Sequence, residues 1–354
     1  MDFVVTATDR AAFKRCRRQW DFGSAHRRDL EPADPAQVSL QNAIKDALAV
    51  YYYPGTWDWP RQIVLPLVYK GFERSMGEAP GSATGTDILR QYIKWAPTLD
   101  DFAPIKIDHD VDGMVADPSV PNRGLLTADG RRVSYAGRVD LLAVDATDIY
   151  WVVRHQVVPD WQDLEALVLD EEAVAGCWAW EQAYLGMEIA GTIHNEIRTA
   201  VSEQQRESPE IDALEPPRVA QHEPSGGGRS IPQHRRLYAR GLPTSGASRV
   251  DQRTAGPLRR TLIRRTRPEI AAAGRLIGEE ALAMSAADLA AYPTPGPHCR
   301  DCAFATPCLA ITACVDPTPA LASFRRRPAT PPKPRLGQST WGFGRGAAPP
   351  SFDS

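Results

Sequence analysis

Cysteine thiols are the side chains of this sequence whose spacing most directly indicates chemistry. Cys299, Cys302 and Cys308 form a C-x2-C-x5-C pattern near the C-terminal end, and Cys16 lies almost the whole chain away from them. Thiols at this spacing can converge on one small object when a short loop reverses the chain. Cysteine thiolates bind zinc or iron–sulphur clusters in sets of four. The pattern therefore predicts a tetrahedral thiolate site that joins the two ends of the fold.

Other roles for these cysteines must be weighed against a thiolate site. They could be buried as small apolar side chains, but Pro297, Pro307 and the charged pair that follows Cys299 favour a loop. A disulfide is disfavoured because charged residues interrupt any apolar leader, which predicts a reducing, cytoplasmic location. Zinc and an iron–sulphur cluster both accept four cysteines, and the spacing alone does not separate them. We expect Cys177 to lie in the core, whereas Cys314 is either an idle thiol or a substitute ligand.

Arginine is concentrated in one part of a chain whose net charge is only −3. Between Arg229 and Arg275 the basic residues far outnumber the acidic ones. Such a cluster indicates a polyanionic partner, although a solvated loop face would have the same composition. No segment approaches the roughly 20 apolar residues that span a bilayer, so we expect a soluble protein without membrane association. The apolar residues, 43% of the 354, are enough for a substantial core.

The N-terminal part of the chain predicts helices that would position Cys16. Thr8 can cap a helix from Asp9 to about Phe22. Within it, Phe13, Cys16 and Trp20 share one face because they are three and four residues apart. Further helices are predicted over Ala36–Tyr53 and Asp87–Trp95, with a mixed segment over Thr56–Gly77 between them.

From about Ile105 onward the apolar residues follow the period of strands rather than helices. The clearest alternation covers Val133–Leu142, and a partner strand follows over Ile149–Val158. The neighbouring segments are predicted as an extended stretch (Ile107–Val115), a loop (Pro118–Gly124), a long helix (Asp163–Leu185) and a further strand (Met187–Asn195). This order predicts an α/β (α+β) fold in which helices cover a mixed sheet.

One domain is predicted over residues 1–315. Within it, residues 201–256 form a variable, partly disordered insertion rich in Pro, Gly and Ser. Thr266 and Glu269 then form a capping box that opens a helix to about Met284. Residues 316–354 are rich in Pro and Gly and are predicted to be a disordered tail.

Taken together, these features resemble a known family. A lone cysteine on an opening helix, the G-x-x-D tetrapeptide Gly137-Arg138-Val139-Asp140, a following strand and the closing cysteine pattern are similar to the RecB-like branch of the PD-(D/E)XK nuclease superfamily. The most similar members are the iron–sulphur ones: AddB-type helicase-nuclease subunits and CRISPR-associated RecB-like exonucleases. The resemblance spans roughly Thr6 to Leu309, apart from the arginine-rich insertion. It implies a restriction-endonuclease-like core. It also implies a [4Fe–4S] cluster, rather than zinc, on Cys16, Cys299, Cys302 and Cys308.

The resemblance also implies a hydrolytic site. In this family a carboxylate on one strand faces a D/E-x-K motif on the next, and two carboxylates hold magnesium or manganese. The metal activates a water, which the lysine orients for attack on a phosphodiester. Asp140 corresponds to the first carboxylate. Arg154 stands at the second carboxylate, Gln156 at the lysine, and Lys45 at a helical histidine that often completes the metal shell.

These replacements predict a damaged hydrolytic centre. A guanidinium at Arg154 would pair with Asp140 and repel a divalent cation, and Gln156 carries no positive charge. His155 falls on the apolar face of its strand and is expected to be a core histidine. Activity with magnesium or manganese would then require other carboxylates to move into the metal shell, the candidates being Asp145, Asp163, Glu172 and Glu181.

The leading interpretation is an iron–sulphur, nuclease-like DNA-binding protein of DNA repair, recombination, or phage- or CRISPR-type DNA processing, without hydrolytic activity. Its DNA would be single-stranded or a duplex end, and a helicase or recombination subunit could be its partner. The alternatives are an active exonuclease with migrated ligands, and a zinc-stapled scaffold or partner-binding module. In the leading interpretation, phosphate is contacted by Arg17, Arg18, Arg259, Arg260, Arg264 and Arg265.

Overall fold

The structure, a computed structural model, describes residues 2–33, 39–199 and 249–327. The chain divides into two compact units. The first comprises Met1–Gln37, Val115–Tyr135 and Ile277–Ser354, and the second comprises Val38–Met114 and Ala136–Leu276. The sequence predicted a single domain over 1–315 and did not indicate this division. The first unit contains segments from both ends of the chain.

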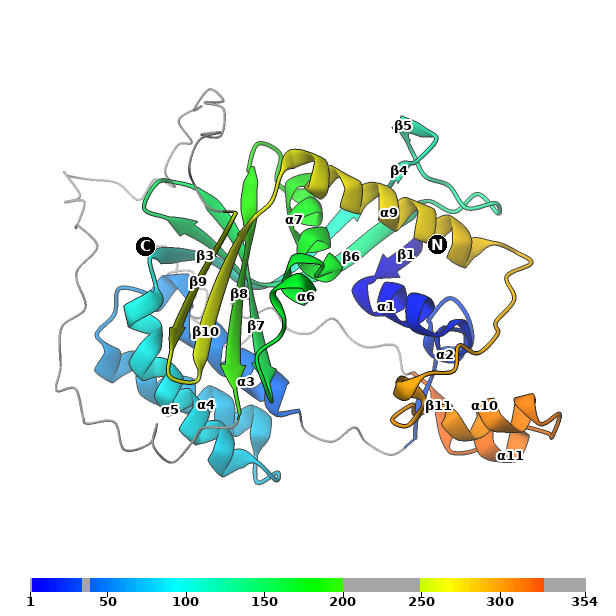
Figure 1. The fold of residues 1–354 in the computed structure, drawn as a ribbon, viewed down its shortest axis with the longest axis horizontal. Coiled ribbons are helices and arrows are strands. Elements are labelled where there is room, and N and C mark those ends of the chain that lie inside the picture. Colours follow the sequence, from blue (N-terminus) through cyan, green and yellow to red (C-terminus); the bar gives the residue numbers. More distant parts are fainter. Residues whose placement is uncertain (1, 34–38, 200–248, 328–354) are drawn as a thin grey trace, which may run out of the picture. The chain divides into compact units, whose positions relative to one another are not determined.

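Short helices and strands make up the first unit (Figure 1). In chain order they are β1 (Phe3–Thr6), α1 (Ala7–Arg15), α2 (Arg17–Gly23), β2 (Leu30–Pro32), β4 (Ala116–Asp117), β5 (Val120–Gly124), the 3-10 helix η2 (Pro297–Cys299), α10 (Ala305–Thr312), α11 (Thr318–Leu321) and β11 (Phe324–Arg326). The predicted loop at Pro118–Gly124 is thus largely the second strand of the β4–β5 pair.

The first helix begins earlier than predicted. The Thr6 hydroxyl accepts a hydrogen bond from the Asp9 N–H at 3.0 Å, and the Asp9 carboxylate accepts one from the Thr6 backbone N–H at 3.4 Å. This reciprocal arrangement is a capping box. Thr6, not Thr8, is therefore the N-cap.

Cys16 interrupts the predicted single helix. Its backbone is extended, at φ −163° and ψ 111°, and it separates α1 from α2. Phe13, Cys16 and Trp20 are all buried. The predicted common environment of these three residues is confirmed, although their continuous helix is not.

The second unit is built on a longer set of elements. They are α3 (Leu40–Tyr51), η1 (Pro54–Thr56), α4 (Arg61–Met76), α5 (Ser82–Leu99), β3 (Phe102–Met114), β7 (Tyr150–Val158), α6 (Leu164–Val168), α7 (Glu171–Ala183), β8 (Ile189–Arg198), β9 (Val250–Ala255) and β10 (Leu258–Arg264). Two elements, β6 (Val133–Asp145) and α9 (Arg267–Ser285), continue from one unit into the other.

A mixed sheet carries the candidate site. Its order among the described strands is β1-β6-β7-β8-β10-β9, and β3 also pairs with β6. Strands β7 and β8 are parallel, with Arg154 opposite His194, whereas β6–β7, β8–β10 and β10–β9 are antiparallel. The predicted mixed α/β fold, with helices flanking a mixed sheet, is confirmed.

Helices cover both faces of this sheet in the second unit (Figure 1). The buried residues of α3, α4 and α5 pack against Trp151, Val153 and Ile193 on one face. Helix α7 lies on the other face, since a Cβ built at Gly176 would lie 3.8 Å from Val152, which alternates along β7 with Trp151 and Val153. Alternate residues of β7 therefore point to different helices, which decides what each can contact.

Several boundaries differ from prediction. The helix expected over Asp163–Leu185 is two helices, because the Asp170 side chain accepts a hydrogen bond from the Ala173 N–H at 3.0 Å and caps α7. Helix α5 is longer than the predicted Asp87–Trp95, and the mixed segment before it is mainly α4. The predicted start of α3 at Ala36 lies outside the described residues. The capping box of Thr266 and Glu269 is confirmed at α9.

The arginine-rich segment contains strands that the sequence did not reveal. Residues 249–256 were assigned to an insertion, but β9 pairs with β10 through a turn in which Gly256 has φ +56°. The rest of that insertion, up to residue 248, lies outside the described part. The first part of the predicted tail is ordered instead, because it contains α11 and β11 and β11 pairs with β2. The rest of the predicted tail, residues 328–354, lies outside the described residues. No helix in the described ranges is long and apolar enough to cross a membrane.

Candidate functional site

The candidate hydrolytic site lies where β6 and β7 part. Their antiparallel register runs from Val144 opposite Tyr150 to Leu141 opposite Val153, and Asp140 is the next residue of β6. The His155 N–H of β7 donates to Asp140 Oδ2 at 2.9 Å. The side chain of Asp140 thus accepts a hydrogen bond from β7 just beyond the last pair of the two strands, Leu141 and Val153. Asp140 therefore has a structural role at the end of the β6–β7 pairing.

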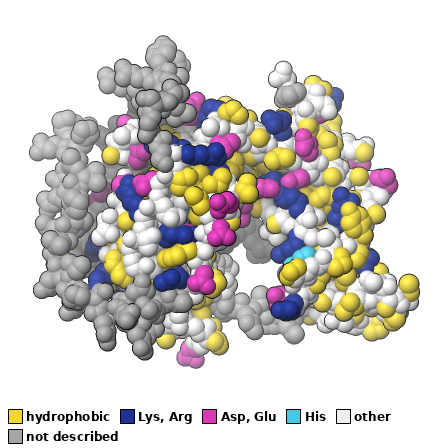
Figure 2. Space-filling model, viewed as in Figure 1, with side chains coloured by type: hydrophobic (Ala, Val, Ile, Leu, Met, Phe, Trp, Pro, Cys, Tyr) yellow, Lys and Arg dark blue, Asp and Glu magenta, His cyan; other side chains and the backbone are white. Residues whose placement is uncertain are grey.

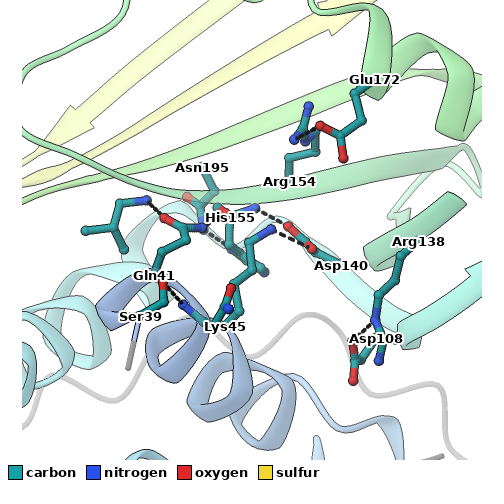
Figure 3. A network of polar contacts seen from close by, with 12 residues as sticks. Ser39, Gln41, Lys45, Asp108, Arg138, Asp140, Arg154, His155, Glu172 and Asn195 are labelled. Atoms are coloured by element: carbon teal, nitrogen blue, oxygen red, sulfur yellow. Dashed lines mark hydrogen bonds and ion pairs between the residues drawn. The ribbon is translucent and has the colours of Figure 1, made fainter. Parts of the chain in front are cut away.

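Gln41 of α3 satisfies the next backbone groups of the same strand (Figure 3). Its amide nitrogen donates to the His155 carbonyl at 2.9 Å, and its amide oxygen accepts from the Val157 N–H. Backbone groups must find partners when they are removed from water. Gln41 therefore anchors α3 to the end of β7 and sets the distance from α3 to Asp140.

Lys45, one helical turn after Gln41, places an ammonium on Asp140. Lys45 Nζ lies 3.0 Å from Asp140 Oδ1, and the two side chains are 30% and 16% exposed. Both oxygens of Asp140 are consequently engaged, one by a cation and one by a backbone N–H. A divalent cation at Asp140 would have to displace this ammonium or share the carboxylate with it.

Arg154 does not occupy the position expected for it. The prediction that its guanidinium pairs with Asp140 is corrected, because it donates to Asp170 at 2.6 and 2.7 Å and to Glu172 at 2.7 Å. Figure 3 shows Arg154 and Glu172 on the opposite side of β7 from Asp140. Burial alone would lower the pKa of Arg154, but Asp170, Glu172 and Asp140 outweigh burial and raise it. Arg154 therefore stays positively charged and still interacts electrostatically with Asp140.

Gln156 and His155 also take different sides of β7. The side-chain oxygen of Gln156 is buried without a hydrogen-bond partner among the described residues. His155 is only 3% exposed, and its ring stacks on Tyr52 with centroids 5.5 Å apart. His155 Nδ1 lies 3.0 Å from the Asn195 amide nitrogen. The expectation of a core histidine is confirmed.

His155 belongs to a buried polar network that the sequence did not indicate. The Tyr52 and Tyr92 hydroxyls are 2.7 Å apart, and the Tyr52 hydroxyl donates to Asp100 at 3.0 Å. Arg260 balances the charge of Asp100 at 2.8 Å. Burial raises the pKa of Asp100 despite this arginine and lowers the pKa of His155 to about 4. The network holds α3, α5 and the sheet together beneath the candidate site.

The carboxylates considered as replacement metal ligands are mostly engaged elsewhere. Glu172 pairs with Arg154, and Glu181 accepts from Arg267 and from the Ile189 N–H. Asp145 caps the turn after β6, where it accepts from the Thr147 and Ile149 N–H groups. Asp163 is the N-cap residue of α6, without a capping hydrogen bond from its side chain. These positions do not place a second carboxylate on Asp140.

The four cysteines of the predicted thiolate site all lie in the first unit. They are free thiols; Cys16 is buried, Cys302 and Cys308 are half-buried, and Cys299 is exposed. Burial raises the pKa of Cys302, a backbone hydrogen bond at Phe304 opposes this, and the neighbouring thiols Cys16, Cys299 and Cys308 raise it further. Cys16 is thus near enough to the C-terminal thiols to interact with Cys302.

Direct contacts join the same two segments. Arg18 donates to the Ala291 carbonyl at 3.2 Å and to the Thr312 hydroxyl at 3.0 Å, and its guanidinium lies 3.8 Å from Cys308 Sγ. The rings of Phe22 and Phe304 stack at 5.1 Å. In residues 2–33, 39–199 and 249–327, no group of three or more His, Cys, Asp or Glu side chains is arranged to hold a metal ion. The two segments are adjacent through these contacts.

The other two cysteines are distinct from this group. Cys177 is fully buried, as predicted, and burial raises its pKa to about 12. Cys314 is exposed, at φ +55°.

Three of the arginines predicted to contact phosphate point inward. Arg259 pairs with Glu196 at 2.6 Å, Arg260 pairs with Asp100, and Arg265 donates to the Leu167 carbonyl at 3.1 Å. All three are buried, which corrects their assignment to a DNA-facing surface. On the face seen in Figure 2, basic and acidic side chains are interspersed.

The other predicted phosphate contacts keep more of their surface. Arg264 is half-buried and lies over the Trp151 ring at 5.2 Å. Arg17 is half-buried beside Phe13, and Arg18 is taken up by the contacts described above. Of the arginines predicted to contact phosphate, Arg17 and Arg264 therefore remain candidates.

Comparison with known proteins adds no family to this description. No family model matches the chain, and no curated protein matches it. Among solved structures, one similar chain is described as "Crystal structure of SSO0001", with a TM-score of 0.26 and 12% sequence identity. The match covers 56% of this chain and 64% of that chain, less than two thirds of its length. A similarity of this size carries no argument about fold or function.

Proposed function

We propose that this chain is a nuclease-like DNA-binding protein that holds an iron–sulphur cluster and no longer hydrolyses DNA. The observation that carries this proposal is the ion pair of Lys45 with Asp140, combined with the hydrogen bond from the His155 N–H to the same carboxylate. The family resemblance assigns Asp140 to a divalent cation. Here its carboxylate accepts from the Lys45 ammonium and from the His155 N–H.

The surroundings of Asp140 support loss of hydrolysis. The resemblance places a second carboxylate at residue 154 and a lysine at residue 156, where this chain has arginine and glutamine. Arg154 is committed to Asp170 and Glu172. A water beside Asp140 would therefore lack the second carboxylate and the strand lysine that the resemblance assigns to the site, and the lysine that is present, Lys45, is paired with Asp140.

The contacts between the chain ends support the cluster. Cys16, Cys299, Cys302 and Cys308 would supply four thiolates, and the bound cluster would add a covalent cross-link between the N-terminal helices and the C-terminal loop. Arg18 already joins these segments through the Ala291 and Cys308 carbonyls. Zinc on the same thiolates is the alternative.

DNA binding and hydrolysis can be tested in one titration. Anaerobically purified protein is mixed with fluorescein-labelled single-stranded DNA or with a duplex end, and anisotropy is followed from low to high salt with and without Mn²⁺. We expect binding that weakens linearly with the logarithm of salt concentration, since phosphate contacts release counterions. The labelled strand should stay intact on a denaturing gel.

The alternatives give different outcomes in the same experiment. Absent binding, or binding that does not change with salt, would exclude a phosphate-contacting protein and favour a partner-binding module. Degradation that depends on Mn²⁺ and is abolished by Asp140→Ala would favour an active exonuclease with migrated ligands. Asp58→Ala, at an exposed aspartate of the second unit, is the matched control.

A further inference from the structure

A pocket in the first unit lies beside the N-terminal helices and is not part of the Asp140 site. It has a volume of about 230 Å³. Its lining combines aromatic rings, two cations and a hydroxyl, from Phe13, Lys14, Arg17, Tyr292 and Thr294. The first three come from α1 and the start of α2, and the last two from the segment that leads into the cysteine loop.

The pocket is held in place by backbone contacts. The Arg18 N–H donates to the Tyr292 carbonyl at 3.1 Å, and the Arg18 guanidinium donates to the Ala291 carbonyl at 3.2 Å. These bonds tie the Tyr292 segment to α2. The aromatic wall opposite Phe13 is therefore positioned by the fold.

Arg17 stands between two aromatic rings. Its guanidinium carbon lies 5.2 Å from the Phe13 ring centre and 5.0 Å from the Tyr292 ring centre, within cation–π range of both. Within the described part of the chain its charge is not paired with a carboxylate. Lys14, by contrast, is paired with Glu280 at 3.1 Å. Arg17 is therefore the cation of this pocket that is available to bind an anion.

Tyr292 is the more exposed of the two aromatic residues in the pocket. It is 50% exposed, whereas Phe13 is 7% exposed. A half-exposed tyrosine next to a guanidinium can stack a flat ring while the cation contacts a neighbouring phosphate. A ligand that presents both a flat ring and an anion fits this pair better than an aliphatic or purely acidic peptide does.

We propose that this pocket binds one nucleotide unit of single-stranded nucleic acid, with the base against Tyr292 and the phosphate on Arg17. The inference rests on the proposed DNA binding and adds the place and the strandedness of the contact. Bases in a duplex are stacked on their neighbours and do not offer a free face, so the pocket selects unpaired nucleotides.

The test is the binding of a fluorescein-labelled oligothymidylate, measured by anisotropy over a salt series with the full chain. Stacking contributes about 1–3 kcal/mol per base, so Tyr292→Ala should weaken binding about 5- to 150-fold. Its dependence on salt should stay unchanged, and Tyr292→Phe should bind as the unmodified chain does. Arg17→Ala should weaken binding and reduce the slope of log K against log salt by about one.

Matched controls separate this pocket from general effects. Tyr53→Ala removes a 37%-exposed tyrosine of the second unit, and Arg15→Ala removes an exposed charge two residues from Arg17. Neither control should lose affinity beyond the small effect of one distant charge. Ultraviolet cross-linking to the oligothymidylate, mapped by mass spectrometry, should place the adduct on Tyr292.

The outcomes distinguish the two proposals. If the unmodified chain binds with a salt dependence but Tyr292→Ala and Arg17→Ala match their controls, the pocket inference is overturned and DNA binding stands. If the unmodified chain does not bind at any salt concentration, DNA binding is overturned and the inference with it. Equal affinity for the oligothymidylate and a blunt duplex of the same length would overturn the selection of unpaired nucleotides.

Discussion

The carboxylate of Asp140 accepts from a cation and a backbone N–H at once, which gives it a role in stability. Removing a largely buried acceptor leaves its donors unsatisfied, at a cost of about 1–3 kcal/mol. Asp140→Ala should therefore lower the free energy of unfolding by about that amount. Asp140→Asn should lower it less, because one oxygen can still accept from the His155 N–H.

Urea unfolding measures both effects. Asp58→Ala, at an exposed position, is the control and should stay near the unmodified chain. If Asp140→Ala were as stable as Asp58→Ala, the hydrogen bonds described at Asp140 would contribute nothing and the structural role would be wrong.

Two buried histidines predict a loss of stability in mild acid. Burial lowers the pKa of both His155 and His194 to about 4, and the nearby Asp140 and Asp170 only partly oppose it. Between pH 6.5 and 4 the unfolded chain binds protons on these rings that the folded chain does not. The free energy of unfolding should therefore fall as pH decreases, by about 1.4 kcal/mol per pH unit for each histidine.

This dependence is checked by urea unfolding at pH 7 and pH 5. His155→Gln and His194→Gln should each reduce the difference between the two pH values. An unchanged difference in both variants would show that other groups cause the acid sensitivity.

At the residue scale, part of the candidate site could be predicted and part could not. The burial of His155 follows from strand alternation, and Lys45 was placed at the site by the family resemblance. Gln41 was missed, although it is four residues before Lys45 and so lies on the same helix face. The partners of Arg154 could not be found, because Asp170 comes from a helix cap whose position depends on packing across the sheet.

At the scale of the elements, strands β8 and β10 lie so close together at Gly191 that there is no room for a methyl group there. A Cβ built at Gly191 would lie 2.1 Å from the Ile263 carbonyl oxygen. Because that atom is backbone, the two strands would have to separate. We expect Gly191→Ala to lower the free energy of unfolding by more than about 2 kcal/mol, through lost strand pairing and strain.

The control for this prediction is Gly176→Ala in α7. A Cβ there meets Val139 and Val152 at 3.7 and 3.8 Å, which are ordinary contacts. Alanine is the better helix former, so this variant should be neutral or more stable by up to about 1 kcal/mol. Thermal unfolding of both variants by circular dichroism compares them directly, and equal melting temperatures would contradict the close approach of β8 and β10.

Elements were predicted where local signals are strong. The alternation of β6 and β7 and the capping box of α9 are local and were found. Strands β9 and β10 were missed because their arginines look like a solvated face, whereas the fold buries Arg259 and Arg260 against Glu196 and Asp100. Such pairing joins residues that are far apart in sequence, and composition alone does not show it.

For the molecule as a whole, the first unit depends on contacts between the two ends of the chain. Phe304 stacks on Phe22 at 5.1 Å and on Phe324 at 5.0 Å, and it is only 7% exposed. Replacing a buried phenylalanine with alanine costs about 3–5 kcal/mol. Phe304→Ala should lower the melting temperature by several degrees, and Phe304→Leu should lower it less. A melting temperature unaffected by Phe304→Ala would mean that these contacts do not stabilise the unit.

The proposed function depends most on four thiolates from opposite ends of the chain sharing one iron–sulphur cluster. The direct measurement is the visible absorbance and iron content of the full chain after anaerobic purification. We predict a broad band at about 400 nm and about four irons per chain. Both should be lost in Cys16→Ser and in Cys302→Ser but kept in Cys177→Ser. A colourless protein without iron, or a band that survives Cys16→Ser unchanged, would contradict it.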